Sequence, residues 1–325
     1  MTMSFVTLEE ILAARRRIAG KVRRTFCNLS PVLTERAGVP VFMKLEHQQI
    51  TGSFKLRGAT NAVLALDPET RAKGIVAVST GNHGRALAYA ARAAGARATI
   101  CMSELVPRAK IEGIAQQGAD IRIIGRSQDE AQREVDRLIE AEGVATIPPF
   151  DHRDVIAGQG TLGLEMVEDL PEMATALVQL SGGGLISGVA AAIKARRPDV
   201  RVIGITMERG AAMHASLAAG RPVEVEELPT LADSLGGGIG IANRLTFAMT
   251  RDLVDDVVLL TEEEIATGIR HCYHAEGQVV EGAGAVGAAA ILAGKVRSDG
   301  PVALILSGGN IDMDDHRRLI CGGTA

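Results

Sequence analysis

A lysine at the start of a predicted helix could serve as an amine nucleophile. Lys55 stands between Phe54 and Leu56, Ser53 could cap the helix, and apolar residues repeat at helical spacing over positions 59–66. Apolar surroundings and the positive end of a helix dipole both favour the neutral amine over the ammonium form. We therefore predict that Lys55 can attack an aldehyde. A surface lysine at a helix start has the same local sequence, so this interpretation depends on the other motifs.

A glycine-rich turn follows an apolar strand predicted at residues 176–180 and precedes a predicted helix. Its residues are Ser181, Gly182, Gly183, Gly184 and Leu185. Unpaired backbone amides at a helix start bind phosphate. The glycines lack the spacing of a dinucleotide-binding turn, and no lysine follows them as in a nucleotide P-loop. An amine that attacks an aldehyde and a turn that binds phosphate together indicate pyridoxal 5′-phosphate (PLP).

A second polar loop follows the apolar residues 75–78 and opens another predicted helix. It contains Thr80, Gly81, Asn82 and His83. Its amides could hold a carboxylate, and Asn82 could hydrogen-bond a phenolic oxygen. A strand-to-helix turn capped by Asn82 has the same pattern, and we assign no acid–base role to His83.

Ser307 follows the last apolar strand. Its neutral hydroxyl could face a pyridine nitrogen and leave that nitrogen unprotonated. A tight loop after a central strand would have the same sequence. The interpretation of Ser307 therefore depends on the motifs that precede it.

Short β-branched runs alternate with alanine-rich helical patterns, which predicts an α/β fold with two open parallel-sheet domains. Strands are predicted at residues 41–45, 75–78, 98–101, 121–124, 176–180, 201–205, 257–260 and 302–306. We predict a small α/β domain at residues 73–148, inserted into a large domain made of residues 1–72 and 149–325. A ligand would bind in the cleft between them, at the carboxyl ends of strands.

Composition excludes several classes of function. The net charge is −4, and the chain has two tyrosines and no tryptophan, so we expect no nucleic-acid partner. No apolar run reaches the roughly 20 residues that span a bilayer, and no signal peptide is seen, so we expect no membrane partner. The four cysteines lack paired spacing, which is typical of reduced thiols in a cytoplasmic protein.

The motifs, taken in this order, closely resemble the serine/threonine dehydratase family of fold-type II PLP enzymes, which have the tryptophan synthase β-like fold. The resemblance extends from residue 13 to Asn310 and includes Lys44-Leu45-Glu46, residues 156–161 and residues 281–284. Residues 79–86, 209–213 and 231–240 look most like one branch, the hydroxyectoine utilization dehydratases.

The resemblance implies roles for the motif residues. Lys55 would bind the cofactor aldehyde and later act as general base at the substrate α-carbon, while Phe54 and Asn82 would contact the cofactor ring. The turn that begins at Ser181 would hold the phosphate, and Ser307 would contact the pyridine nitrogen.

The loop at residues 80–83 would receive the substrate carboxylate. Thr80 would be a catalytic residue, at a place where racemising relatives carry a serine. The added methyl of threonine crowds the site, so we expect no racemisation. Arg85 replaces a glutamine of the family and could bind a further substrate carboxylate, or it could be a solvated helix residue.

The implied reaction is α,β-elimination of water from a β-hydroxy amino acid, which gives ammonia and an oxoacid or enamine. The substrate would be threonine-like, serine-like or derived from hydroxyectoine, and the enzyme would be a homodimer or larger homo-oligomer. Alternatives are a 3-hydroxyaspartate dehydratase, a β-replacement enzyme of the cysteine synthase type, and a ligand sensor without PLP. Thr206 and Ala212 stand where metal-binding relatives carry acidic ligands, so we predict no metal there.

Overall fold

The larger of two β-sheets has six strands. The computed structural model describes residues 5–106 and 108–322. The strand order is β1-β2-β10-β7-β8-β9, and only β1 runs antiparallel to its neighbour. The strands are β1 (Cys27–Leu29), β2 (Val41–Lys44), β7 (Thr175–Gln179), β8 (Arg201–Met207), β9 (Asp256–Leu260) and β10 (Val302–Ile305). Strands β7 and β10 are buried throughout and β10 is entirely apolar, as expected for parallel strands covered on both faces.

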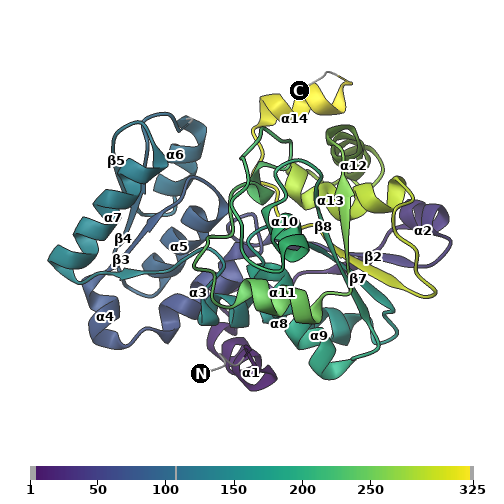
Figure 1. Ribbon diagram of the computed structural model, residues 1–325, viewed down its shortest axis with the longest axis horizontal. Coiled ribbons are helices and arrows are strands. Elements are labelled where there is room, and N and C mark those ends of the chain that lie inside the picture. The colour runs from purple at the N-terminus through teal and green to yellow at the C-terminus, as the bar shows by residue number, and fades with distance from the viewer. Residues whose placement is uncertain (1–4, 107, 323–325) are drawn as a thin grey trace.

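The smaller sheet has four parallel strands in the order β5-β4-β3-β6. They are β3 (Ile75–Val78), β4 (Ala98–Met102), β5 (Asp120–Ile123) and β6 (Ala145–Thr146). Figure 1 shows this sheet on the left and the larger sheet on the right. The predicted α/β fold with two parallel sheets is confirmed.

Helices connect the parallel strands, because a parallel connection must cross from one end of the sheet to the other. They are α1 (Leu8–Ile18), α2 (Pro31–Ala37), α3 (Lys55–Ala65), α4 (Pro68–Lys73), α5 (Asn82–Ala93), α6 (Arg108–Ala115), α7 (Gln128–Glu142), α8 (Arg153–Asp169), α9 (Gly184–Arg196), α10 (Ala212–Ala219), α11 (Thr246–Leu253), α12 (Glu262–His274), α13 (Gly282–Leu292) and α14 (Met313–Ile320), with short 3₁₀ turns η1 (Glu46–Gln48) and η2 (Asp233–Leu235). None of the helices in the described part of the chain is both long and apolar enough to cross a membrane.

Helix α3 lies between the two sheets (Figure 1). Its apolar residues, among them Leu56 and Val63, pack into the core of the smaller sheet together with Val155 of α8. That core therefore includes residues outside 73–148, and the division into an inserted and a large domain stays a prediction.

The predicted cap of α3 is wrong. Phe54 occupies the N-cap position and makes no side-chain cap bond. Ser53 instead pairs through its backbone with Gly308, and its buried hydroxyl has no partner. This pairing joins the start of α3 to the loop after β10.

A buried network of ion pairs anchors α3. Arg57 contacts Glu46 at 2.8 Å and Glu165 at 2.7 Å, and Lys44 contacts Glu165 at 2.9 Å and Asp169 at 2.8 Å. Burial alone would raise the pKa of Glu46, but the charge and hydrogen bonds of Arg57, together with the Thr25 hydroxyl and the Lys44 charge, lower it. The network ties α3 to the larger sheet and to α8, two residues beyond Lys55.

Arg57→Met should lower the free energy of unfolding by about 3–5 kcal/mol, because it leaves buried carboxylates without their cation. Urea denaturation of the cofactor-free protein measures this change. The matched control is Arg108→Met, which removes an exposed pair with Glu112 and should change stability by less than about 0.5 kcal/mol. Equal effects of the two substitutions would contradict the anchoring role.

Candidate active site

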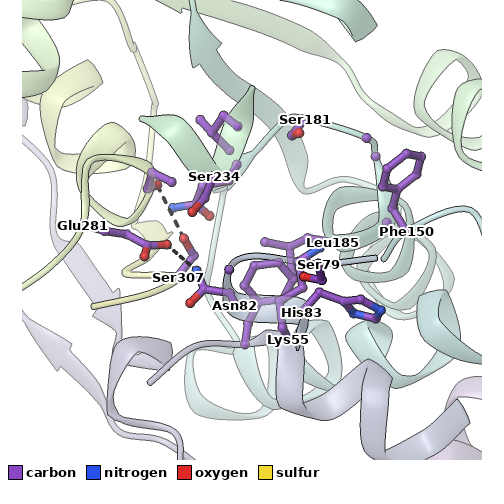
Figure 2. Close-up of a pocket in the computed structure, with 18 residues that line it drawn as sticks. Lys55, Ser79, Asn82, His83, Phe150, Ser181, Leu185, Ser234, Glu281 and Ser307 are labelled. Atoms are coloured by element: carbon purple, nitrogen blue, oxygen red, sulfur yellow. Dashed lines mark hydrogen bonds between the residues drawn. The ribbon is translucent and has the colours of Figure 1, made fainter. Parts of the chain in front are cut away.

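A cavity of about 190 Å³ lies at the carboxyl ends of strands β3, β7 and β10. Ligands bind at this end of open parallel sheets. Figure 2 shows side chains from both sheets around the cavity. Its lining consists of Phe54, Lys55, Ser79, Gly81, Asn82, His83, Phe150, Gln179, Ser181, Gly182, Gly183, Gly184, Leu185, Ser234, Leu235, Glu281, Ala283 and Ser307.

Lys55 is the first residue of α3 and extends its amine into this cavity. Its Nζ donates a hydrogen bond to the Pro149 carbonyl oxygen at 2.9 Å and lies 5.3 Å from the Phe54 ring centroid. Burial lowers the pKa of Lys55 to about 8, against the opposing effect of the Glu281 charge. The neutral form of this amine is therefore far more populated near physiological pH than that of an exposed lysine, and the neutral amine can attack an aldehyde.

The glycine turn after β7 has no room for side chains. A Cβ atom on Gly182 would lie 2.4 Å from the Phe150 ring, one on Gly184 would lie 2.8 Å from Phe150 Cα, and Gly183 has a φ of +87°. Since α9 begins at Gly184, its first amides face the cavity without helical partners. The bare turn and the facing lysine fit the phosphate and the aldehyde of PLP.

A chain of hydrogen bonds fixes the amide of Asn82. Its Nδ2 donates to Glu281 Oε1 at 2.7 Å (Figure 2), and its Oδ1 accepts from Asn310 Nδ2 at 2.6 Å. The second hydrogen on Nδ2 remains for a phenolic oxygen. Arg85 donates to Asn310 Oδ1 at 3.3 Å and so lies at the far end of the chain.

Glu281 is an acidic residue of the cavity to which the sequence analysis gave no role. Burial, followed by the charge of Asp233, raises the pKa of Glu281 to about 7, and the hydrogen bond from Asn82 opposes this shift. The signal that could have found it is a carboxylate directly before a long apolar helix, α13. Phe150 and Gln179 are further lining residues that the sequence analysis missed.

Two predicted residues, Thr80 and Arg85, do not line the cavity as the structure describes it. Ser79 and Gly81 line the cavity on either side of Thr80. Arg85 is turned toward α6, where a Cβ on Gly113 would lie 2.1 Å from Arg85 Nη2, and toward Asn310. Its guanidinium therefore lies between α6 and the loop that carries Asn310, and the structure does not place it against a substrate.

The other predicted site residues all line the cavity, His83 and Ser307 among them. His83 is buried, its Nε2 bonds to the Ile147 carbonyl oxygen at 2.8 Å, and burial with the nearby Lys55 charge lowers its pKa to about 3. It is therefore neutral. Ser307 is buried and donates a long bond, 3.4 Å, to the Ala283 carbonyl oxygen.

Within residues 5–106 and 108–322, no group of three or more His, Cys, Asp or Glu side chains is arranged to hold a metal ion. Thr206 is buried at the end of β8, and Ala212 begins α10. The expected absence of a metal at this location stays a prediction.

The fold and this cavity define a PLP-dependent enzyme, and comparison with known proteins agrees. The family model described as "Pyridoxal-phosphate dependent enzyme" matches residues 18–308. The chain superposes on maize serine racemase with a TM-score of 0.92 and 36% identity, covering 97% of each chain. It superposes on the processed form of threonine deaminase isoform 2 from Solanum lycopersicum with a TM-score of 0.86 and 31% identity, covering 99% of this chain and 97% of that one.

Curated relatives narrow the assignment. A protein named putative threonine dehydratase from Sinorhizobium fredii is 60% identical over 321 residues, covering 98% of this chain and 97% of the relative. The L-threonine ammonia-lyase of Thermotoga maritima is 43% identical over 318 residues, covering 98% of this chain and 79% of the relative. The chain belongs to the serine/threonine dehydratase family of fold-type II PLP-dependent enzymes, and it is a lyase.

Glu281→Gln should change how the stability of the cofactor-free protein depends on pH. Because the folded-state pKa is raised from 4.5 to about 7, the folded protein binds more protons than the unfolded one between these values. Its free energy of unfolding therefore falls as pH rises through this window. The variant lacks this fall and should be more stable by about 3 kcal/mol above pH 7. Urea denaturation at a series of pH values tests this, and parallel curves for the two proteins would contradict it.

Proposed function

We propose that the protein removes water from L-threonine or L-serine and releases ammonia and a 2-oxoacid. The observation that carries this proposal is the shared cavity of the Lys55 amine and the phosphate-binding turn that begins at Ser181. The names of the relatives support the same reaction class. The substrate is a proposal, because the relatives' names describe those proteins.

The side chains divide the work of elimination. PLP, when bound, supplies an electron sink at the substrate α-carbon. Lys55 takes the α-proton, for which a pKa of about 8 is suited near neutral pH. The amides at the start of α5 hold the substrate carboxylate near the positive end of that helix. Asn82, fixed by Glu281 and Asn310, would donate to the phenolic oxygen of the cofactor and so orient the ring.

The charge of the cavity favours a neutral substrate side chain. Glu281 faces the cavity, and Asp233 lies close enough to raise its pKa. A second substrate carboxylate would meet these acids, while the cation that could have received it, Arg85, is bonded to Asn310. We therefore favour threonine and serine over 3-hydroxyaspartate.

A substrate panel tests this function. We expect ammonia release from L-threonine and L-serine to exceed release from 3-hydroxyaspartate by at least about tenfold in kcat/KM, because like charges repel in a desolvated site. Lys55→Ala should reduce turnover by at least about a thousandfold and remove the visible absorbance of the bound cofactor. Lys73→Ala, an exposed lysine of α4, is the matched control and should change neither.

Two results would contradict the proposal. One is full turnover by Lys55→Ala. The other is faster consumption of O-acetylserine with sulfide than of threonine, which would indicate a β-replacement enzyme of the cysteine synthase type. Preference for 3-hydroxyaspartate would contradict only the argument from charge.

A second candidate substrate is a ring-opened hydroxyectoine derivative, a β-hydroxy amino acid with a longer, nitrogen-bearing side chain. It is favoured by an outer chamber of about 420 Å³ that shares Glu281 with the cofactor cavity. Its charged lining residues are Lys110, Asp233, Glu281, Asp312, Asp315 and Arg318. The excess of carboxylates suits a cationic substituent. In the same panel, a 3-hydroxy-2,4-diamino acid with a kcat/KM above that of threonine would support this substrate, and a lower value would contradict it.

We further propose a homodimer or a larger homo-oligomer. Phe26 is 72% exposed, Leu29 is 49% exposed, and Val32 is also exposed. They lie on or beside β1, the edge strand of the larger sheet, whose outer side is open to pairing. Exposed large apolar side chains gathered at an edge are typical of an interface.

Phe26→Asp should weaken the oligomer, because it places a charge in an apolar interface. Sedimentation velocity should show a shift toward monomer at micromolar concentration. The matched control is Ile241→Asp, because Ile241 is also an exposed apolar residue and lies outside β1. This variant should leave the sedimentation coefficient unchanged. An unchanged mass for Phe26→Asp would contradict the use of this edge.

We also propose a cytoplasmic location. All four cysteines lie in the described residues, and each is a free thiol. Burial raises the pKa of Cys272 to about 12, which makes this thiol unreactive. Free thiols of this kind are typical of a reducing compartment.

A further inference from the structure

The segment that joins the smaller sheet to α8 carries an acceptor for the Lys55 amine. It spans residues 147–152, between β6 and α8. The Lys55 Nζ donates to the Pro149 carbonyl oxygen of this segment at 2.9 Å. A carbonyl oxygen only accepts hydrogen bonds and does not ionise, so it can hold an N–H of the amine whether the amine is charged or neutral. The contact therefore fixes the direction of the amine in both protonation states.

Two prolines and a buried histidine hold this carbonyl from one side. Pro148 and Pro149 both lack a backbone N–H, and their rings restrict the φ angle of the backbone. Directly before them, the Ile147 carbonyl oxygen bonds to His83 Nε2 at 2.8 Å. The segment is thus held to the start of α5.

Asp151 holds the segment from the other side, by tying it to α11. Its carboxylate accepts hydrogen bonds from the backbone amides of Arg244 at 2.6 Å, Leu245 at 2.8 Å and Thr246 at 3.0 Å. Amides at the start of a helix have no helical partner, so the carboxylate satisfies them. Pro149 is therefore fixed between two anchored neighbours.

Phe150 places the same segment against the phosphate-binding turn. Its ring and its Cα fill the space above Gly182 and Gly184 (Figure 2). On the other side of the turn, a Cβ atom on Gly183 would lie 2.9 Å from Thr246 Cβ at the start of α11. Consecutive residues of one segment thus contact the amine, the phosphate-binding turn and α11. The spacing between the amine and the turn is therefore set by this segment.

We propose that Pro149 is a positioning residue, whose carbonyl oxygen directs the Lys55 amine toward the substrate α-carbon. This role rests on the proposed function, in which Lys55 takes the α-proton. A lysine side chain has many rotamers, and a base is effective only when its lone pair points at the proton. Because one N–H is bonded to a fixed carbonyl, fewer directions remain for the lone pair.

Replacing Phe150 by 3-phenyllactic acid tests the proposal, because it converts the Pro149–Phe150 amide into an ester and keeps every side chain. An ester carbonyl is a weaker hydrogen-bond acceptor than an amide carbonyl. The holoenzyme should lose about fivefold in kcat for L-threonine, the equivalent of one hydrogen bond. Its KM should stay within about twofold, because the contact orients the base and does not bind the substrate.

The cofactor-free protein gives a second readout. A charged ammonium donates a stronger hydrogen bond than a neutral amine, so a weaker acceptor should lower the pKa of Lys55 further below about 8. The pH dependence of Lys55 acetylation, followed by mass spectrometry, measures this pKa. The Glu281 carboxylate and the His83 ring, which also act on this amine, are the same in both proteins.

Replacing Phe26 by 3-phenyllactic acid is the matched control. It makes the same change at the Thr25 carbonyl oxygen, which accepts a hydrogen bond from Lys44 Nζ at 2.8 Å outside the cavity lining. The Phe26 side chain is kept. This control should change neither kcat nor the pKa of Lys55.

Side-chain variants test how the carbonyl is held. Asp151→Ala should also lower kcat by about fivefold or more, because the segment loses its anchor on α11. Asp151→Asn keeps one acceptor oxygen and should lose less. Asp67→Ala removes another carboxylate that accepts from a backbone amide, that of Thr70 at 2.9 Å on exposed α4, and should leave kcat unchanged.

Three results are decisive. An unchanged pKa of Lys55 in the ester variant at position 150 would overturn the proposal, because the Pro149 carbonyl would then not hold the amine. An unchanged kcat would also overturn it, because the contact would then not orient the base. Absence of turnover of both L-threonine and L-serine by the unmodified enzyme would contradict the proposed function instead.

Discussion

The burial of one amine is the constraint on which the rest of the structure depends. Lys55 must lie in a desolvated cavity to lose its proton easily, and a buried lysine needs a helix that does not move. The ion pairs of Arg57 meet this need two residues further along α3. A site that favours a neutral lysine thus stands next to a network that requires a charged arginine.

The two sheets contribute different parts of the site. The smaller sheet supplies the loop after β3, which begins α5 with Asn82 and which we propose to bind the substrate carboxylate. The larger sheet supplies the phosphate-binding turn after β7 and Ser307 after β10. The carboxyl ends of parallel strands lie at one edge of a sheet. When these edges of the two sheets face each other, the loops after β3, β7 and β10 therefore meet in one cavity. Helix α3, which packs against α5 and α8, places Lys55 between them.

The sequence predicted the eight longer strands because each is an apolar, β-branched run. It missed β1 and β6, which are short and mostly exposed, so no hydrophobic pattern marks them. The lysine and glycine motifs were found because their chemistry is local. Glu281 was missed because its raised pKa arises from burial beside residues distant in the sequence. The direction of the Arg85 side chain could not be predicted either, because it depends on α6 and Asn310.

The contact between Lys110 of α6 and Asp233 of η2 joins the two sides of the outer chamber at 3.0 Å. Both side chains are about half exposed, at 43% and 56%, so dissolved ions reach them easily. Coulomb attraction between such groups weakens as ionic strength rises, whereas groups shielded from solvent are little affected. Salt therefore loosens this contact between α6 and η2 and leaves the buried ion pairs of Arg57 and Lys44 nearly unchanged. How firmly the two sides of the chamber hold together is thus set partly by the surrounding medium, while the anchoring of α3 is not.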